Sequence, residues 1–71
     1  MDGLVIMTKH HTYQIEGWKR GALVFRTEVS DDIEGTRRSA KELHDTLGIM
    51  YTVFILVDGS EQYAQGGWAS L

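Results

Sequence analysis

The sequence predicts an α+β fold in which one helix packs on one face of a small antiparallel sheet of four strands. Three patterns predict it: a hairpin over residues 12–29, an amphipathic helix over 31–47, and an apolar strand over 49–57. A right-handed crossover through the helix makes the third strand parallel to the second, so the third strand pairs with the first. The expected element order is ββαββ and the expected strand order is 2-1-3-4.

Residues 12–29 are typical of a β-hairpin because apolar and polar residues alternate on both sides of Gly21. A three-residue loop over 19–21, with its glycine in the left-handed region, fixes the register. On one face the expected pairs are Gly17–Leu23, Ile15–Phe25 and Tyr13–Thr27, and on the other they are Trp18–Ala22, Glu16–Val24, Gln14–Arg26 and Thr12–Glu28. A slip of one residue mixes the two faces, so the sorting supports this register.

Residues 31–47 predict a helix that lies on the sheet with its back in water. Ser30 or Asp31 caps its first turn, and Gly48 follows its last residue as a C-cap. A narrow apolar stripe repeats at three- and four-residue steps: Ile33, Thr36, Ala40, Leu43 and Leu47.

The third strand, over 49–57, has one polar residue in nine and is expected to be buried on both faces. Asp58-Gly59 predicts a turn into a short polar edge strand over 60–65. All 71 residues form one domain, with 66–71 as a tail and 1–10 as an N-terminal extension or an extra edge strand. The residues before Met7 are also consistent with a leader, and both interpretations stay open.

One helix shields only one side of a sheet, but the third strand carries two apolar rows. Either row can lie under the helix, and we place the row of Ile49, Tyr51, Val53, Ile55 and Val57 there. The other row then lies on the uncovered face, where large apolar groups typically mark an interaction site. The expected protein interface is Trp18, Val24, Met50, Phe54, Leu56 and Trp68. The alternative is that the tail or residues 4–7 cover this face within one chain.

The sequence points to no catalytic chemistry, no cofactor and no metal site. It has no cysteine, no glycine-rich phosphate loop and no nucleophile elbow. His10 and His11 are adjacent, so in a strand they point to opposite faces and cannot chelate one ion together with His44. The acidic residues over 31–34 are explained by helix capping. We therefore expect a non-enzymatic protein.

These observations favour a small cytoplasmic protein-interaction module that self-associates or binds another protein, for example a phage or mobile-element accessory protein acting on a host protein. The alternative is a nucleic-acid-associated module that uses a basic hairpin tip, Lys19 and Arg20 with Trp18, and a basic helix patch, Arg37, Arg38 and Lys41. The net charge of −3 disfavours it. A small-ligand site lined by Trp18, Phe54 and Trp68 is a third interpretation. No apolar run reaches the roughly 20 residues of a membrane span, so we expect no membrane partner.

Overall fold

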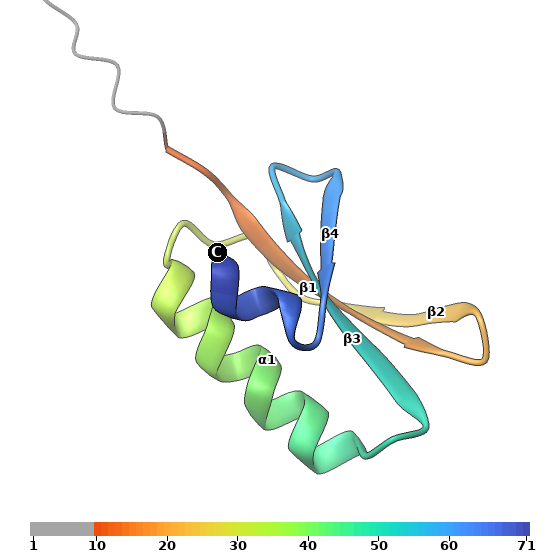
Figure 1. Cartoon of the computed structure of the whole chain (residues 1–71). Helices are drawn as coiled ribbons and strands as arrows, with labels where there is room; N and C mark the ends of the chain where they lie inside the picture. Colours follow the sequence, from red (N-terminus) through yellow and green to blue (C-terminus); the bar gives the residue numbers. More distant parts are fainter. Residues whose placement is uncertain (1–9) are drawn as a thin grey trace, which may run out of the picture.

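The computed structural model describes residues 10–71 as a four-stranded sheet with one helix on one side (Figure 1). The elements are β1 (Tyr13–Lys19), β2 (Ala22–Arg26), α1 (Ile33–Leu47), β3 (Tyr51–Val57), β4 (Glu61–Ala64) and a 3-10 turn, η1 (Gly67–Ser70). All neighbouring strands are antiparallel and the order is β2-β1-β3-β4, which confirms the predicted fold class and strand order. The expectations for residues 1–9 lie outside the described residues.

The hydrophobic core lies between α1 and the sheet. Its buried residues are Tyr13, Ile15, Ala40, Val53, Ile55 and Trp68. The predicted helical stripe is confirmed, because Thr36 and Ala40 are buried and Ile33, Leu43 and Leu47 are partly buried against the sheet. The row of β3 that contains Val53 and Ile55 faces the helix, also as predicted. The opposite row, with Thr52, Phe54 and Leu56, therefore faces away from α1.

The β1–β2 hairpin forms as predicted, but its register differs. Arg20 and Gly21 both have positive φ and form a two-residue turn, so the expected three-residue loop is wrong. The observed pairs are Lys19–Ala22, Trp18–Leu23, Gly17–Phe25 and Glu16–Arg26. The register shifts between Gly17 and Trp18, which leaves Val24 as the extra residue of a β-bulge. The two-residue turn moves the register by one residue, which alone would place Phe25 on the side away from α1. The bulge at Val24 returns Phe25 to the helix side.

Gly17 leaves the space that the Phe25 side chain occupies. The two residues are direct partners across the hairpin, and a Cβ at Gly17 would overlap the far edge of the Phe25 ring. The ring packs from this position against the buried core. The small residue in β1 therefore determines which residue of β2 reaches the core, and with it the place of the bulge.

The helix begins one residue later than the cap we expected. The side chain of Asp32 accepts a hydrogen bond from the Gly35 N–H at 3.0 Å, and Ser30 Oγ accepts one from the Asp32 N–H at 3.0 Å. The expectation of Ser30 or Asp31 as N-cap is therefore wrong, although Ser30 supports the residue that does cap. Gly48, at φ 82°, ends the helix as predicted, and its N–H donates to the His44 carbonyl.

Two residues of the predicted third strand lie in a turn instead. Ile49 and Met50 precede β3, and the Tyr51 N–H donates to the Gly48 carbonyl at 3.3 Å. The strand begins at Tyr51 because that residue pairs with Lys19, the last residue of β1. Beyond this pair β1 turns away, so Ile49 and Met50 have no strand to pair with.

We predict that Gly17→Ala destabilises the protein by about 1–3 kcal/mol, since the added methyl group displaces the Phe25 ring from a packed site. The measurement is the free energy of urea unfolding. In a Phe25→Ala background the same substitution should be neutral or stabilising, because the ring is gone and alanine is better than glycine within a strand. An equal loss of stability in both backgrounds would show that the Gly17–Phe25 contact is not the cause.

Candidate functional site

The sheet face opposite α1, here called the open face, carries the residues that the core does not use. Register and strand alternation assign to it Gln14, Glu16, Trp18, Leu23, Arg26, Thr52, Phe54, Leu56, Gln62 and Ala64. No described residue outside the sheet covers it as a helix or a strand would (Figure 1). The described tail, with η1, lies on the helix side instead, where Trp68 joins the core.

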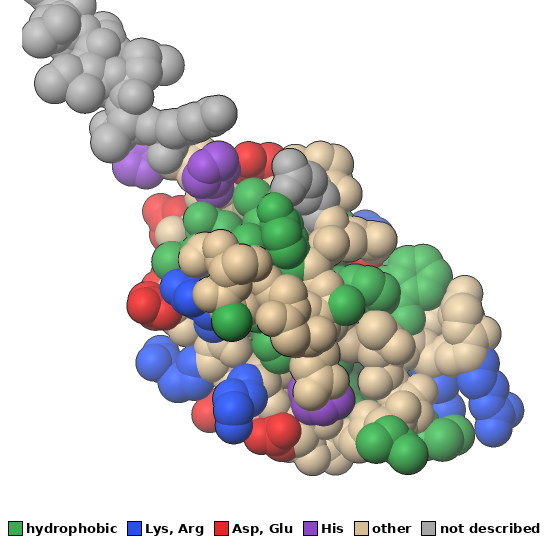
Figure 2. Space-filling model, in the orientation of Figure 1, with side chains coloured by type: hydrophobic (Ala, Val, Ile, Leu, Met, Phe, Trp, Pro, Cys, Tyr) green, Lys and Arg blue, Asp and Glu red, His purple; other side chains and the backbone are tan. Residues whose placement is uncertain are grey.

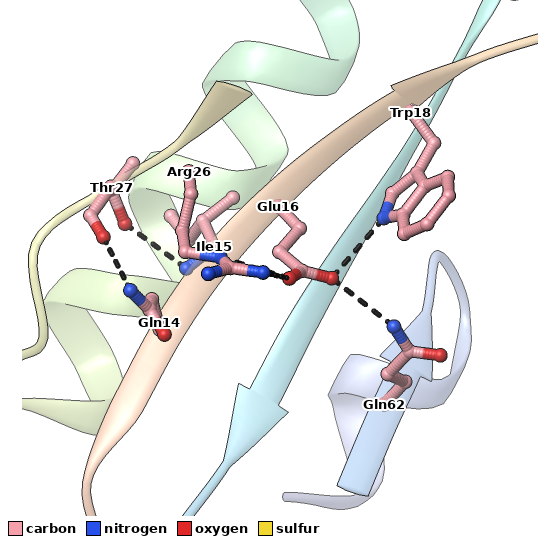
Figure 3. Close-up of polar contacts among 7 residues, drawn as sticks. All are labelled: Gln14, Ile15, Glu16, Trp18, Arg26, Thr27 and Gln62. Carbon is pink, nitrogen blue, oxygen red and sulfur yellow. Dashed lines mark hydrogen bonds and ion pairs between the residues drawn. The ribbon is translucent and has the colours of Figure 1, made fainter. Parts of the chain in front are cut away.

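At the centre of the open face lies a buried carboxylate. Glu16 is 2% exposed, and three side chains from β1, β2 and β4 converge on it (Figure 3). Its Oε1 accepts hydrogen bonds from Trp18 Nε1 and Gln62 Nε2, both at 3.1 Å. Its Oε2 accepts from Nε of Arg26 at 3.0 Å and from a terminal nitrogen of the same guanidinium at 2.7 Å. A single side chain thus ties together three of the four strands.

The surroundings of Glu16 keep it ionised. Burial by itself raises its pKa, but hydrogen bonds from Trp18, Arg26 and Gln62 and the positive charge of Arg26 outweigh burial and hold the pKa below its ordinary value. A carboxylate offers about four lone-pair sites, and the four hydrogen bonds use them all. Glu16 therefore positions its neighbours and has no free acceptor for a substrate or a metal ion.

Two aromatic side chains lie beside this network. Trp18 from β1 and Phe54 from β3 meet edge to face, with ring centroids 6.4 Å apart. Together with Arg20, Gly21, Thr52 and Gln62 they line a recess of about 260 Å³. This volume is below the roughly 300–1,000 Å³ of ordinary small-molecule sites, so the recess suits a single inserted side chain or ring.

Three of the predicted interface residues lie on the open face. Trp18 and Phe54 are partly exposed there, whereas Leu56 is already buried among the side chains of this face. The other three, Val24, Met50 and Trp68, are placed differently by the structure.

Each of these three corrections has its own physical cause. Val24 is the bulge residue, so it has no partner in β1 and does not lie opposite Glu16 as expected. Met50 lies in the turn before β3. Trp68 is 7% exposed in the helix-side core, where its Nε1 donates to the Tyr63 carbonyl at 2.6 Å. Its large indole fills space beside α1, and so it is not part of the expected interface or of a ligand site with Trp18 and Phe54.

The predicted basic hairpin tip and the predicted basic helix patch lie on different elements of the structure. Lys19 and Arg20 lie at the β1–β2 turn, while Arg37, Arg38 and Lys41 lie on α1. Figure 2 shows blue side chains as separate groups at opposite sides of the molecule. Arg37 pairs with Glu34 at 3.1 Å and Lys41 with Asp45 at 3.4 Å, so both of these helix cations have acidic partners. The five residues therefore do not form one continuous contact surface.

Within residues 10–71 no group of three or more histidine or acidic side chains is arranged to hold a metal ion. His11 and Asp58 form a pair at 2.7 Å, and the other oxygen of Asp58 accepts from the Thr12 N–H at 3.0 Å. This pair fastens the residues before β1 to the turn after β3. In the same part of the chain, no helix has the length and hydrophobicity needed to cross a membrane.

A larger groove of about 750 Å³ lies between α1 and residues 27–30, on the side of the helix near β2. Several of its polar groups already have local partners. Asp32 caps the helix, the Thr36 hydroxyl donates to the Asp32 carbonyl at 2.7 Å, and the Thr27 hydroxyl accepts from the Ile15 N–H at 3.0 Å. These groups serve the helix cap and the hairpin, and we take the open face, where polar and aromatic side chains converge, as the candidate site.

The sequence did not reveal Glu16 as a buried residue. The sequence contained one partial signal, because it predicted an acidic and a basic residue on the same face of the hairpin. It placed Arg26 diagonal to Glu16, whereas the two residues are direct partners. Gln62, which comes from β4, is 46 residues away along the chain and carried no signal.

We predict that Glu16→Gln lowers the free energy of unfolding at neutral pH by about 1.5–3 kcal/mol, because hydrogen bonds to a charged acceptor are lost. The folded-state pKa lies below the ordinary value of 4.5, so the carboxylate stabilises the fold above that pH and the contribution disappears as the pH falls through the folded-state pKa. The difference between wild type and variant should therefore shrink in acid. Urea unfolding between neutral pH and pH about 3 measures it.

The matched control is Glu34→Gln, which removes an exposed helix carboxylate paired with Arg37. Its effect should stay within about 1 kcal/mol, as for other surface ion pairs. If both variants lose the same stability, or if the Glu16→Gln difference does not depend on pH, the network does not hold the open face together.

Comparison of the chain with protein-family models, with curated proteins and with solved structures gives no match. The support for a function therefore comes from the geometry of the described residues.

Proposed function

We propose that this protein is a non-enzymatic interaction module that self-associates through the open face. The observation that carries the proposal is the uncovered sheet face on which Trp18 and Phe54 line a recess, with the Trp18 indole held by Glu16 and Phe54 packed edge to face against it. Aromatic side chains fixed in one arrangement are typical of the residues that dominate the energy of protein interfaces. The absence of cysteine from the sequence is consistent with the cytoplasmic location that belongs to this proposal.

The chemistry of the open face favours a second copy of the chain as the occupant. The charges of Glu16 and Arg26 compensate each other at 2.7 Å, so the centre of the face is locally neutral although the chain carries a net charge of −3. Two such faces can approach each other around a two-fold axis without like charges meeting at the centre. In the proposed dimer, Trp18 and Phe54 of each copy contact the recess of the other.

We predict that the wild-type protein sediments at twice its 8.0 kDa protomer mass at high concentration. Thr52→Arg should shift the mass to that of one protomer, because it places an uncompensated cation beside the recess. Thr52 is exposed, so the substitution leaves the core intact. Sedimentation equilibrium measures the mass, and circular dichroism checks that the variant is folded.

Ser39→Arg is the matched control, since Ser39 is equally exposed but lies on α1. It should leave the mass unchanged. Phe54→Asp is a second disrupting variant. A wild-type mass of one protomer at every concentration, or a dimer that tolerates both Thr52→Arg and Phe54→Asp, contradicts the proposal.

A second candidate function, binding of single-stranded nucleic acid, is favoured by one observation. Arg20 lines the same recess as Trp18 and Phe54, so a cation and two aromatic rings are available to one base and its phosphate. The two aromatic residues lie on the two central strands of an open four-stranded sheet, which is an arrangement that proteins use to stack bases.

If this second function operates, the wild type should bind a fluorescent single-stranded oligonucleotide at low salt, and the affinity should fall as salt rises. Arg20→Asn should weaken binding several-fold, since it removes a charge while asparagine tolerates the positive φ of the turn. Arg38→Asn, on the exposed back of α1, is the control and should bind like the wild type. Fluorescence anisotropy across a salt series measures this, and no signal at low salt excludes the function.

A further inference from the structure

We propose that the protein makes a second, separate contact: one end of the sheet docks reversibly on an anionic membrane surface. This end, here called the apolar end, consists of Leu23, Val24, Ile49 and Met50. It adjoins the open face, because Leu23 pairs with Trp18 there and Arg20 also lines the recess, but the proposed contact does not depend on self-association.

The strand register brings two chain segments together at the apolar end. Lys19 pairs with Ala22 on one side and with Tyr51 on the other, and it is the last residue of β1. The turn between β1 and β2 and the turn before β3 therefore leave the sheet at the same end. Leu23 and Val24 follow the first turn, and Ile49 and Met50 make up part of the second.

The aliphatic side chains of this end are unusually exposed. Ile49 is 95% exposed, Met50 53%, Val24 51% and Leu23 42%. Among the described residues, only one other large hydrophobic side chain, Val29, is comparably exposed. Exposed aliphatic groups gathered at one end of a small domain indicate a contact with an apolar environment.

The charges at this end have one sign. Residues 17–25 contain Lys19 and Arg20 and no acidic residue, and residues 48–57 contain no charged residue at all. The protein as a whole carries a net charge of −3, so its acidic residues lie elsewhere. In Figure 2 a blue group and a green group lie next to each other at the lower right of the molecule. An apolar tip with adjacent cations is complementary to acyl chains below a layer of anionic headgroups.

Two amphipathic aromatic residues lie directly behind the tip. Tyr51 begins β3 and Trp18 is the second-last residue of β1, and the Lys19 ammonium lies over the Tyr51 ring at 5.3 Å from its centroid. Tyrosine and tryptophan favour the boundary between headgroups and acyl chains. Aliphatic, aromatic and cationic side chains thus occur together at this end of the sheet.

A lipid surface fits this end better than a protein partner does. Ile49 and Met50 lie in a projecting turn, and Leu23 and Val24 lie at the start of an edge strand beside the cations of the β1–β2 turn, whereas the aromatic recess that would suit a protein lies on the open face. Two cations and a few aliphatic residues give weak and reversible binding. The prediction of no membrane partner was based on the length of apolar segments, which concerns a membrane span and not a surface contact.

The test uses co-sedimentation of the protein with vesicles of pure phosphatidylcholine and with vesicles that contain phosphatidylserine as well. The wild type should bind the anionic vesicles at least fivefold more than the neutral ones, and rising salt should weaken the binding. The double variant Ile49→Ser/Met50→Ser and the single variant Arg20→Asn should each lose most of this binding. Both changes are at exposed positions in turns, so the fold is retained, which circular dichroism confirms.

Two matched controls distinguish this end from the rest of the surface. Val29→Ser removes an aliphatic residue about as exposed as Met50, and Arg38→Asn removes an exposed cation, both away from the apolar end. Both should bind the anionic vesicles like the wild type. No preference of the wild type for anionic vesicles, or equal losses in the controls and the test variants, would overturn the proposal.

The open-face variant Thr52→Arg separates this contact from self-association. This variant should sediment at the mass of one protomer. It should still bind anionic vesicles in preference to neutral ones. If the Ile49→Ser/Met50→Ser variant instead changes the mass in the absence of lipid, while wild type ignores vesicles, the apolar end contacts protein and the lipid proposal is wrong.

Discussion

A single 15-residue helix covers only one side of a four-stranded sheet, and the structure is organised around this limit. On the helix side, the narrow stripe on α1 leaves room that is filled from the end of the chain, where Trp68 joins Ala40, Val53 and Ile55 in the core. On the other side no second layer is present among residues 10–71. The open face is therefore ordered by its own side chains, whose hydrogen bonds converge on the carboxylate of Glu16.

Glu16 shows how a face can be ordered without a covering element. Its hydrogen bonds connect β1 to β2 through Arg26 and to β4 through Gln62, and they fix the indole of Trp18 within β1. A buried charge is costly unless it is fully paired, and here all of its acceptor sites are used. The side chains that a partner would meet are thereby held in one arrangement before binding, which lowers the entropy lost in forming a complex.

The surface separates into regions of different chemistry. The back of α1 carries paired charges such as Arg37–Glu34, as expected for a solvated helix face. The open face is locally neutral and aromatic, and the apolar end is aliphatic and basic. This separation follows from the topology. The β1–β2 turn and the turn before β3 both leave the sheet next to Lys19, and α1 ends at Leu47, before the second of these turns.

The sequence by itself determined the element order, the helical stripe and the Gly48 cap, because these follow from periodicity and local backbone preference, and the strand order, because the crossover is right-handed. It left open which row of β3 faces the helix, since both rows are apolar. Only the tertiary structure decided the bulge at Val24, the burial of Glu16 and the position of Trp68. The bulge depends on the fit of Phe25 over Gly17, a contact between side chains that the hairpin pattern does not encode. The other two depend on β4 and the tail, where short polar segments dock on surfaces formed by residues distant in the sequence. Periodicity describes how a segment presents its own side chains, and it carries no information about which remote segment fills the space they leave.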